Sequence, residues 1–544
     1  MITAAFGPVR AFASSSRYGC LCSVAAIVPS ATTQLKRSLH LSSPFRYDDY
    51  DNKFFSPPGH NTIVGGRRVW DALTGDYFRV RKRIKEAEYD VYRRKGLLSH
   101  QWRDVFMHDL IPYEVHYLII GGGAIGSSIA YWLRQRYRDE EVRVTVIERD
   151  DTFNQSSSVL GIGGLRQQFS TPELIEMSQF GAEFLRHAGE HLRMLDCEPP
   201  DVPFTPMGYL FLAQNECDKE RLEKDHKTQL HYGVKVALLT REELSAKFPF
   251  MKFDDVLLGS LGLENEGVFD SWSFLTALRE KNLALGVQYI KAELTDFCFE
   301  PVHDLSAEAS LPRHEHWKYE MLRGVVIKPH ASSAAPRPIR CMMCINAAGA
   351  WAGQIATKGR CGYGNDILSL PVPIVKRKRH VFVFYCPEGP GLAMPFLVDP
   401  SGVWCRRDGI GHIYHCGYEP TKEEDEKIDH KTLSIEEDIF YEKILPVLIR
   451  RVPSFASLRY KNAWAGYYDV NLFDNLPVIG EHPIYTNFYQ VSGFGGTGLQ
   501  HSLAVGRAMM EKLLDGAYIA INLRKFDLLR FMHHKKIESE RRQV

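Results

Sequence analysis

A glycine-rich turn at residues 121–126 constrains this chain more than any other feature. A short apolar run precedes the turn, and a segment of helical length and largely apolar character follows it to Leu133. Gly121 permits a tight turn, Gly123 lets the backbone approach a diphosphate, and Gly126 lets a helix pack closely on a strand. The order strand, glycines, helix therefore predicts a dinucleotide site.

A second expected strand, residues 142–148, ends in an acidic residue. Glu148 stands 22 residues after Gly126, where a carboxylate binds the adenosine ribose hydroxyls and disfavours a 2′-phosphate. Ala124 and Ile125 are expected in the first turn of the helix, whose unpaired N–H groups would bind the diphosphate. This spacing indicates FAD or NAD.

The charge balance excludes general attraction to nucleic acid. The chain has 67 basic and 66 acidic residues, a net charge of +1, so recognition depends on particular sites. Its eleven cysteines are scattered, which fits a reducing compartment. Cys341 and Cys344 form one CxxC, but a zinc site needs a second pair of ligands. We expect neither a metal nor, because no apolar run reaches about 18 residues, a membrane-spanning helix.

The N-terminal residues have the composition of a mitochondrial transit peptide. No acidic residue precedes Asp48, and basic residues are spread among serines and alanines, which is typical of import signals. A secretory signal is the alternative, because Cys20 to Val28 is apolar. We expect a transit peptide over 1–45 and a polar, basic extension over 46–112, where 77–95 forms either a surface helix or a docking helix.

Three further motifs point to one family. Residues 155–166 form a serine- and glycine-rich loop that ends in Arg166, residues 344–351 read Cys-Ile-Asn-Ala-Ala-Gly-Ala-Trp, and residues 492–500 read Ser-Gly-Phe-Gly-Gly-Thr-Gly-Leu-Gln. In this order they resemble the D-amino-acid oxidase superfamily of FAD-dependent oxidoreductases, especially its sarcosine and dimethylglycine dehydrogenase branch. The resemblance covers about 115–531.

The resemblance implies a D-amino-acid oxidase fold of class α/β. An FAD-binding, Rossmann-like domain of the glutathione-reductase type is expected from 113–165, 270–360 and 465–520. A mixed β-sheet substrate-type domain is expected from 166–265 and 370–464, and a tail from 521–544. The expected FAD-binding residues are Gly121, Gly123, Ala124, Ile125, Gly126, Glu148, Arg149, Ser157, Gly164, Leu165, Gly349, Trp351, Gly493, Gly495, Gly496, Thr497, Gly498 and Leu499.

Several motifs are similar to those of a mitochondrial group within this superfamily whose members assist assembly of respiratory complex I. They include residues 266–270, 376–379, 406–409 and 462–469. The resemblance implies a flavoprotein on the matrix side of the inner membrane, with possible peripheral membrane contact. Its partners would be complex I subunits or assembly intermediates, and no nucleic acid. The alternative is a dehydrogenase for a small amine or amino acid that passes electrons to a carrier instead of oxygen.

Departures from the family pattern affect the cofactor and the chemistry. The histidine and cysteine that attach FAD covalently in related enzymes are missing from 160–163 and 464–467, so we expect non-covalent FAD. Two lysines of sarcosine oxidases, one activating oxygen and one gripping the substrate carboxylate, correspond to His415 and Gln500. Arg166 and His415 remain the candidate catalytic residues, as an anion clamp and an acid or base. The alternatives are a structural salt bridge for Arg166 and simple packing for His415.

Two basic segments have ordinary explanations. The run Lys376 to Arg379 is expected at a solvated edge, and a face toward a partner or the flavin is the alternative. The tail from Leu523 to Arg542 mixes apolar and basic residues. It would either dock on an anionic membrane or form a capping helix with a frayed end.

Overall fold

The computed structural model describes residues 111–137, 142–194, 198–301, 320–330, 335–362, 369–538 and 540. The expected transit peptide and the basic segment 77–95 lie outside the described residues. Everything below concerns the described part.

A seven-stranded sheet carries the glycine-rich turn. Its strands are β1 (Glu114–Ile120), β2 (Val144–Glu148), β9 (Gln288–Pro301), β10 (Glu320–Pro329), β11 (Arg337–Asn346), β17 (Val478–Glu481) and β18 (Phe488–Ser492). β1 pairs in parallel with β2 and β11, β2 with β9, and β11 with β18. β10 pairs antiparallel with β9 and β11. Leu118 and Ile119 are fully buried in β1, as expected of a parallel strand covered on both faces.

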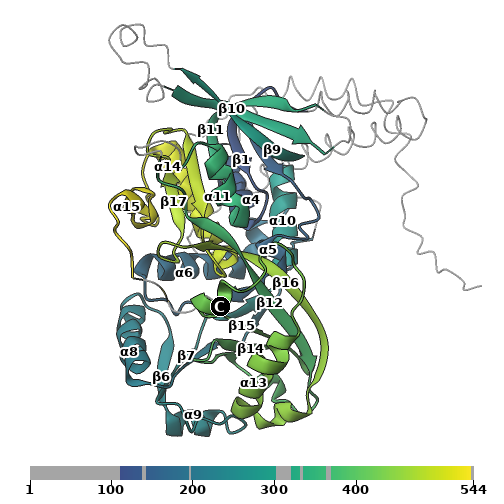
Figure 1. Ribbon diagram of the computed structural model, residues 1–544, viewed down its shortest axis with the longest axis vertical. Coiled ribbons are helices and arrows are strands. Elements are labelled where there is room, and N and C mark those ends of the chain that lie inside the picture. Colours follow the sequence, from purple (N-terminus) through teal and green to yellow (C-terminus); the bar gives the residue numbers. More distant parts are fainter. Residues whose placement is uncertain are drawn as a thin grey trace, which may run out of the picture. The chain divides into compact units, whose positions relative to one another are not determined.

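Four helices belong with this sheet, and Figure 1 shows them in its upper part: α4 (Ala124–Arg136), α10 (Ser271–Ala284), α11 (Ala352–Lys358) and α14 (Gly498–Asp515). α4 and α14 approach each other closely, because a Cβ at Gly506 would lie 2.2 Å from Ser128 Oγ. The indole N–H of Trp132 donates to the Leu503 carbonyl at 2.9 Å. Small residues at the crossing thus fix the two helices whose N-termini face the candidate site.

An eight-stranded sheet forms the second layer, below the first in Figure 1. Its order is β16 (Arg459–Asn471), β12 (Ile374–Tyr385), β15 (Ile413–Tyr418), β14 (Val403–Asp408), β13 (Phe396–Val398), β5 (Tyr209–Ala213), β7 (Leu258–Gly262) and β6 (Val236–Thr240). Its pairs are antiparallel except β13 with β5. β16 stays paired with β12 to Asn471, beyond the domain boundary expected at 464.

Shorter elements connect the two sheets. A small sheet joins β3 (Gly164–Leu165), β8 (Gly267–Phe269) and β4 (Phe204–Pro206). The remaining helices and turns are α5 (Ser157–Leu160), α6 (Pro172–Arg186), α7 (Ala188–His191), α8 (Glu216–His231), α9 (Arg241–Lys247), η3 (Gly349–Trp351), η5 (Gly391–Ala393), α12 (Lys422–Asp425), η6 (Ile439–Ile444), α13 (Leu445–Arg451), η7 (Pro453–Ser457), η8 (Arg524–Phe526) and α15 (Leu529–Met532). Strands of each large sheet come from separated segments, so the expected α/β fold with interleaved sheets is confirmed.

The last described segment docks on the protein itself. Leu523, Phe526 and Phe531 are buried, and the Arg530 guanidinium donates to Asp474 Oδ2 at 2.9 Å and Oδ1 at 3.1 Å. This packing favours the capping-helix interpretation for residues 523–532. Among the described helices, none combines the length and apolar character required to span a bilayer.

Candidate functional site

The glycine turn has the geometry that a close approach to a ligand demands. Gly121 has φ +103°, and a Cβ there would lie 2.4 Å from the Ala347 carbonyl oxygen. A Cβ at Gly126 would lie 2.0 Å from the Gly121 oxygen. Helix α4 begins after Gly123, which has no side chain to cap it, and no acidic residue stands in its first turn. The backbone and the positive end of the helix dipole are therefore presented to the space in front of the turn.

Glu148 lies at the end of β2 and holds the turn. Its Oε2 accepts the Gly122 N–H at 2.7 Å and its Oε1 accepts the Asp150 N–H at 2.8 Å. Burial raises the pKa of the carboxyl, against the opposing effect of these two bonds. The side chain is thus oriented at the place where the sequence predicts the ribose.

The loop after β2 lies across the turn. Ser158 Oγ accepts the Ala124 N–H at 3.0 Å, and Ser156 caps the short helix α5 by accepting the Ser158 N–H. Ser157 donates to the Tyr467 carbonyl. Residues 156–158 therefore connect the first turn of α4 to β16 of the other sheet.

At the opposite end, a second glycine loop leads into α14. Gly493 and Gly495 have φ +83° and +58°, values that favour glycine. Asp469 Oδ2 accepts the N–H groups of Gly493 at 2.7 Å and Phe494 at 3.2 Å. Helix α14 begins after Thr497 without a side-chain cap, so a second helix N-terminus faces the same space.

One cavity runs between these features. Most of the expected FAD-binding residues line it, namely Gly121, Gly123, Ala124, Ile125, Glu148, Arg149, Ser157, Gly164, Gly349, Trp351, Gly495, Gly496, Thr497, Gly498 and Leu499. Gly126, Leu165 and Gly493 do not line it. Gly126 packs α4 on the turn, Leu165 is buried in β3, and the Gly493 N–H binds Asp469.

Other lining residues were not predicted as ligands. They include Asp150, Phe153, Gln155, Ser156, Ser158, Ala292, Leu294, Gln354, Lys358, Tyr468, Asp469 and Gln500. A run of serines at 156–158 was visible in the sequence, and Asp469 closes the motif of residues 462–469. The residues of β9 and α11 carried no local signal, because β9 reaches the cavity through its pairing with β2, and α11 follows β11, which pairs with β1.

Arg166 lies outside the cavity lining. Its side chain is buried, with 2% exposed, and its guanidinium lies over the rings of Phe169 at 4.7 Å and Phe211 at 5.4 Å. Its backbone N–H donates to Gln500 Oε1 at 2.9 Å. Burial lowers the pKa of Arg166. The structure gives Arg166 a packed position, and its catalytic role stays a prediction.

Gln500 lines the cavity and is held by polar contacts on both ends of its amide. Besides accepting from Arg166, its Nε2 donates to Ser178 Oγ at 3.2 Å and contacts His501 Nε2 at 3.1 Å. Burial lowers the pKa of His501 to about 3. The position corresponding to a substrate-gripping lysine therefore holds a neutral, immobilised amide beside a neutral histidine.

His415 also lies outside the cavity lining. Its ring contacts Trp464 edge to face at 5.3 Å, and its Nε2 lies 3.7 Å from Asp408 Oδ2. Burial and the nearby Arg406 lower the pKa of His415 to about 4. It is therefore neutral at physiological pH, and its catalytic role likewise stays a prediction.

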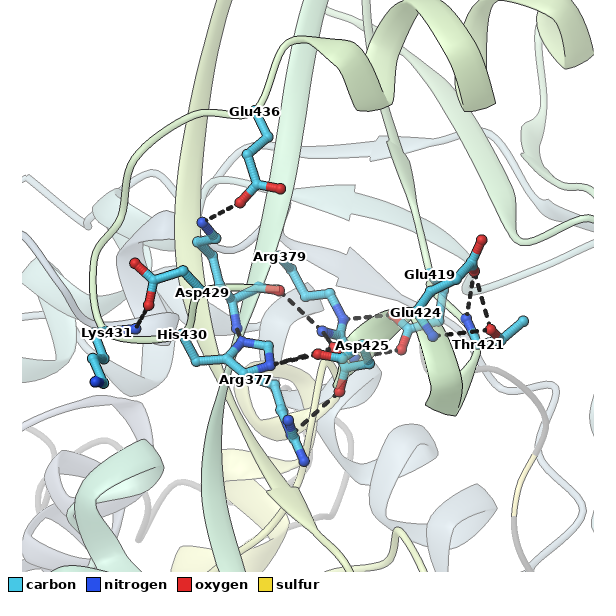
Figure 2. A network of polar contacts seen from close by, with 11 residues as sticks. Arg377, Arg379, Glu419, Thr421, Glu424, Asp425, Asp429, His430, Lys431 and Glu436 are labelled. Carbon is cyan, nitrogen blue, oxygen red and sulfur yellow. Dashed lines mark hydrogen bonds and ion pairs between the residues drawn. The ribbon is translucent and has the colours of Figure 1, made fainter. Parts of the chain in front are cut away.

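The basic run on β12 does not lie at a solvated edge, so that interpretation was wrong. Lys378 has no exposed surface, and its Nζ lies 2.6 Å from Glu436 Oε1. Arg379 donates to both carboxylate oxygens of Glu419, at 3.0 and 2.8 Å, and to Asp425 Oδ1 at 2.6 Å. Figure 2 shows Arg379 of β12 pointing toward Glu419 and Asp425.

This network orders the segment 419–436 beside the site. His430 Nδ1 accepts the Lys378 N–H at 3.0 Å, and the Tyr467 hydroxyl donates to the Lys431 carbonyl at 3.0 Å. Tyr467 in turn contacts Trp351 edge to face at 5.7 Å. These ion pairs and hydrogen bonds thus hold residues 419–436 against β12 and β16. The basic side chains of the run serve packing and not solubility.

FAD fits the residues that line the cavity. Three features are the set of groups that a flavin dinucleotide needs: glycines whose Cβ atoms would collide with the backbone, a carboxylate placed to bind a ribose, and two helix N-termini whose N-cap residues give no side-chain bond. No histidine or cysteine is among the residues found to line the cavity in the described part. When bound, FAD accepts a hydride, while the protein binds and orients it.

Comparison with known families decides the classification. The model of the family described as FAD dependent oxidoreductase matches residues 116–512. The chain belongs to this family. Within this FAD-dependent oxidoreductase family, the protein is 41% identical to "FAD-dependent oxidoreductase domain-containing protein 1" of Xenopus laevis over 429 residues, 78% of this chain and 84% of that protein. It is also 41% identical to the protein of the same name from Bos taurus, over 79% of this chain and 87% of that one.

Solved structures share the fold at low identity. L-proline dehydrogenase from P. horikoshii superposes with a TM-score of 0.62 at 21% identity, covering 78% of this chain and 100% of that chain. Glycine oxidase from Geobacillus kaustophilus gives 0.59 at 18% identity, covering 76% and 98%. FAD is the cofactor of this member of the family, and the D-amino-acid oxidase type of fold is confirmed.

Proposed function

We propose that this chain is a mitochondrial flavoprotein, on the matrix side of the inner membrane, that acts in the assembly of respiratory complex I. Its FAD is held non-covalently and supports the fold, and its partners are complex I subunits or assembly intermediates. Peripheral contact with the inner membrane accompanies that role. The N-terminal composition and the motif resemblance described above motivate the compartment and the partners.

The observation that carries the proposal is the mutual fixation of Arg166 and Gln500. In an amino-acid oxidase a cation must be available to the substrate carboxylate, because charge-assisted bonds supply much of that binding. Here Gln500 is neutral and bonded to the Arg166 backbone at 2.9 Å, and Arg166 is stacked on Phe169 and Phe211. The cations in the cavity wall are engaged elsewhere, since Arg149 lies over Trp351 and Lys358 Nζ donates to the Leu294 carbonyl. A cavity with a neutral amide at the Gln500 position fits a role in which FAD mainly stabilises a binding surface.

Cells that lack this protein test the proposal. We expect complex I to be reduced on native gels and restored by the native chain, with the other respiratory complexes unchanged. Expression of Gly126→Ala, in which the FAD site is disrupted, tests whether complex I assembly requires the bound cofactor. We expect this variant not to restore complex I. Gly411→Ala serves as the matched control. Normal complex I in the knockout would contradict the assembly role.

A second candidate function is a dehydrogenase for a small amine or N-methylated amino acid. It is favoured by a small second cavity of about 20 Å³ that shares Ser157, Gly161, Ile162 and Tyr468 with the cofactor cavity. Tyr418 and Trp404 contribute to its wall. Space of this size holds about one water molecule, so a substrate would require side chains to move.

Anaerobic mixing with a panel of amines tests the second candidate. Loss of the oxidised flavin absorbance with one class of amine would establish turnover. Sarcosine, dimethylglycine, proline and glycine are the first members of the panel, with the matching amines that lack a carboxylate as the comparison. Absence of reduction by all of them, in protein that dithionite reduces fully, would remove this candidate.

A further inference from the structure

Asp469 connects β16 to the glycine loop at one end of the cofactor cavity. Its side chain is 6% exposed, and Oδ2 accepts the N–H groups of Gly493 at 2.7 Å and Phe494 at 3.2 Å. Its own carbonyl accepts the Gly495 N–H at 3.1 Å. The residue itself lines the cavity, together with Phe494 and Gly495. A carboxylate is therefore fixed within the cavity wall by the backbone that shapes it.

The position of Asp469 corresponds to the flavin half of FAD. Glu148 and the start of α4 are placed to hold the ribose and diphosphate, so the isoalloxazine ring would lie toward the other end, where Asp469 and Thr497 line the cavity. The uncapped N-terminus of α14 also faces this end. Two kinds of charge thus meet there: the partial positive charge of amide groups and one titratable carboxylate.

No cation compensates Asp469 among the described residues. Lys376 stands opposite Asp469 on the neighbouring strand β12, but its ammonium lies over the Tyr467 ring, 4.9 Å from the ring centroid. Arg530 is committed to Asp474 at 2.9 Å. No ion pair found in the described part of the chain includes Asp469.

The other polar neighbours of Asp469 in the described structure do not form an ion pair with it either. Tyr468, next along β16, is buried, which raises its pKa to about 12 and keeps it neutral. Arg149, near η3, lies over Trp351 at 4.5 Å. On α14, Gln500 lines the cavity and carries no charge, and the lowered pKa of His501 keeps that ring neutral. Burial raises the pKa of Asp469 to about 6, against the N–H groups that favour its anion.

We propose that Asp469 is a proton-accepting residue that takes up one proton from solvent when the bound FAD accepts two electrons. A hydride donor delivers two electrons and one proton to the isoalloxazine ring, which then carries one negative charge. A like charge nearby disfavours a buried carboxylate, so Asp469 binds one proton from water and becomes neutral. It returns that proton when an electron acceptor reoxidises the flavin. This inference rests on the cofactor cavity and is independent of complex I.

The reduction potential of the native holoprotein as a function of pH tests the proposal. Asp469→Asn has the same shape and keeps an oxygen that accepts from Gly493 and Phe494, but it cannot titrate. A reference dye serves as redox standard. In the neutral range, the reduction potential of the native protein is expected to fall more steeply with pH than that of Asp469→Asn. The difference in slope should correspond to one additional proton taken up for each two electrons. Asp408→Asn, outside the cavity lining, is expected to match the native slope.

A purely structural role for Asp469 would give equal slopes in the native protein and in Asp469→Asn, and that result overturns the proposal. If Asp469→Asn does not retain FAD, proton uptake by the native holoprotein replaces the comparison. Electrodes supply the electrons, and an indicator dye in weak buffer counts the protons. Two protons taken up for each two electrons support the proposal, and one proton contradicts it.

Discussion

The Oε1 atom of Gln500 accepts the backbone N–H of Arg166 at 2.9 Å. This bond joins the first turn of α14 to the segment that follows β3. It therefore links one end of the cavity to the chain that runs between the two large sheets. Because the amide is also bonded to Ser178 and His501, Gln500 serves as part of the frame of the cavity.

Gln500→Lys should destabilise the protein without creating an amino-acid oxidase. The ammonium cannot accept the Arg166 N–H, and a buried donor left without its partner costs about 1–3 kcal/mol. Urea unfolding should show this loss, whereas Gln500→Glu, which keeps an acceptor, should lose less. Native stability together with sarcosine oxidation in the lysine variant would contradict the structural role.

Gly126→Ala should abolish retention of FAD. The new Cβ would lie 2.0 Å from the Gly121 oxygen, and forcing a methyl group into such a contact costs about 1–3 kcal/mol. The turn that faces the diphosphate must shift to relieve it. The ratio of FAD to purified protein measures the effect. Gly411→Ala, with no atom near its Cβ, should keep the native ratio, and an equal ratio in both variants would refute the packing argument.

Asp469 should make stability depend on pH in the FAD-free protein. Its pKa rises from 3.8 to about 6 on folding, so the folded state holds the proton more tightly than the unfolded chain. The stabilisation is therefore complete below the unfolded pKa and is lost as pH rises through about 6. Roughly 2 pKa units correspond to about 3 kcal/mol.

Asp469→Asn removes this dependence. The free energy of unfolding of the variant, relative to the native protein, should therefore rise by about 3 kcal/mol between about pH 4 and pH 7. Urea titrations at the two pH values measure the difference. A difference that does not vary with pH would show that the carboxylate keeps its ordinary pKa.

Arg379→Lys should weaken the network shown in Figure 2. Lysine cannot reproduce the paired bonds to Glu419 and the third bond to Asp425. Breaking a buried ion pair costs about 3–5 kcal/mol when one partner is lost, and the retained charge should reduce that to roughly half. Limited proteolysis within 419–436 should accelerate, while the exposed Lys427→Ala should behave as the native chain.

The glycine turn and the ribose carboxylate could be predicted because their chemistry is local. Gly121, Gly123 and Glu148 act within one strand-turn-helix-strand unit, and their spacing alone indicates the ligand. The second glycine loop was predicted only through family resemblance, because Gly495 reaches the same cavity by the pairing of β18 with β11, far along the chain.

The sequence could not reveal which charges are buried. Lys378 and Arg379 were interpreted as a solvated edge because their partners are distant in the sequence. Glu419 stands 40 positions after Arg379, and Glu436 stands 58 positions after Lys378. Asp469 was visible in its motif, yet its role depends on the fold bringing it against Gly493. Such assignments require tertiary structure, because the compensating groups come from other elements.

We propose that this chain is a flavoprotein whose FAD is bound without a covalent link. The most direct measurement is acid precipitation of the purified yellow protein, followed by the absorbance spectrum of pellet and supernatant. We expect oxidised flavin in the supernatant and a colourless pellet, at one FAD for each chain. Colour that stays with the pellet would contradict non-covalent binding, and a protein that is colourless from the start and takes up no added FAD would contradict the flavoprotein itself.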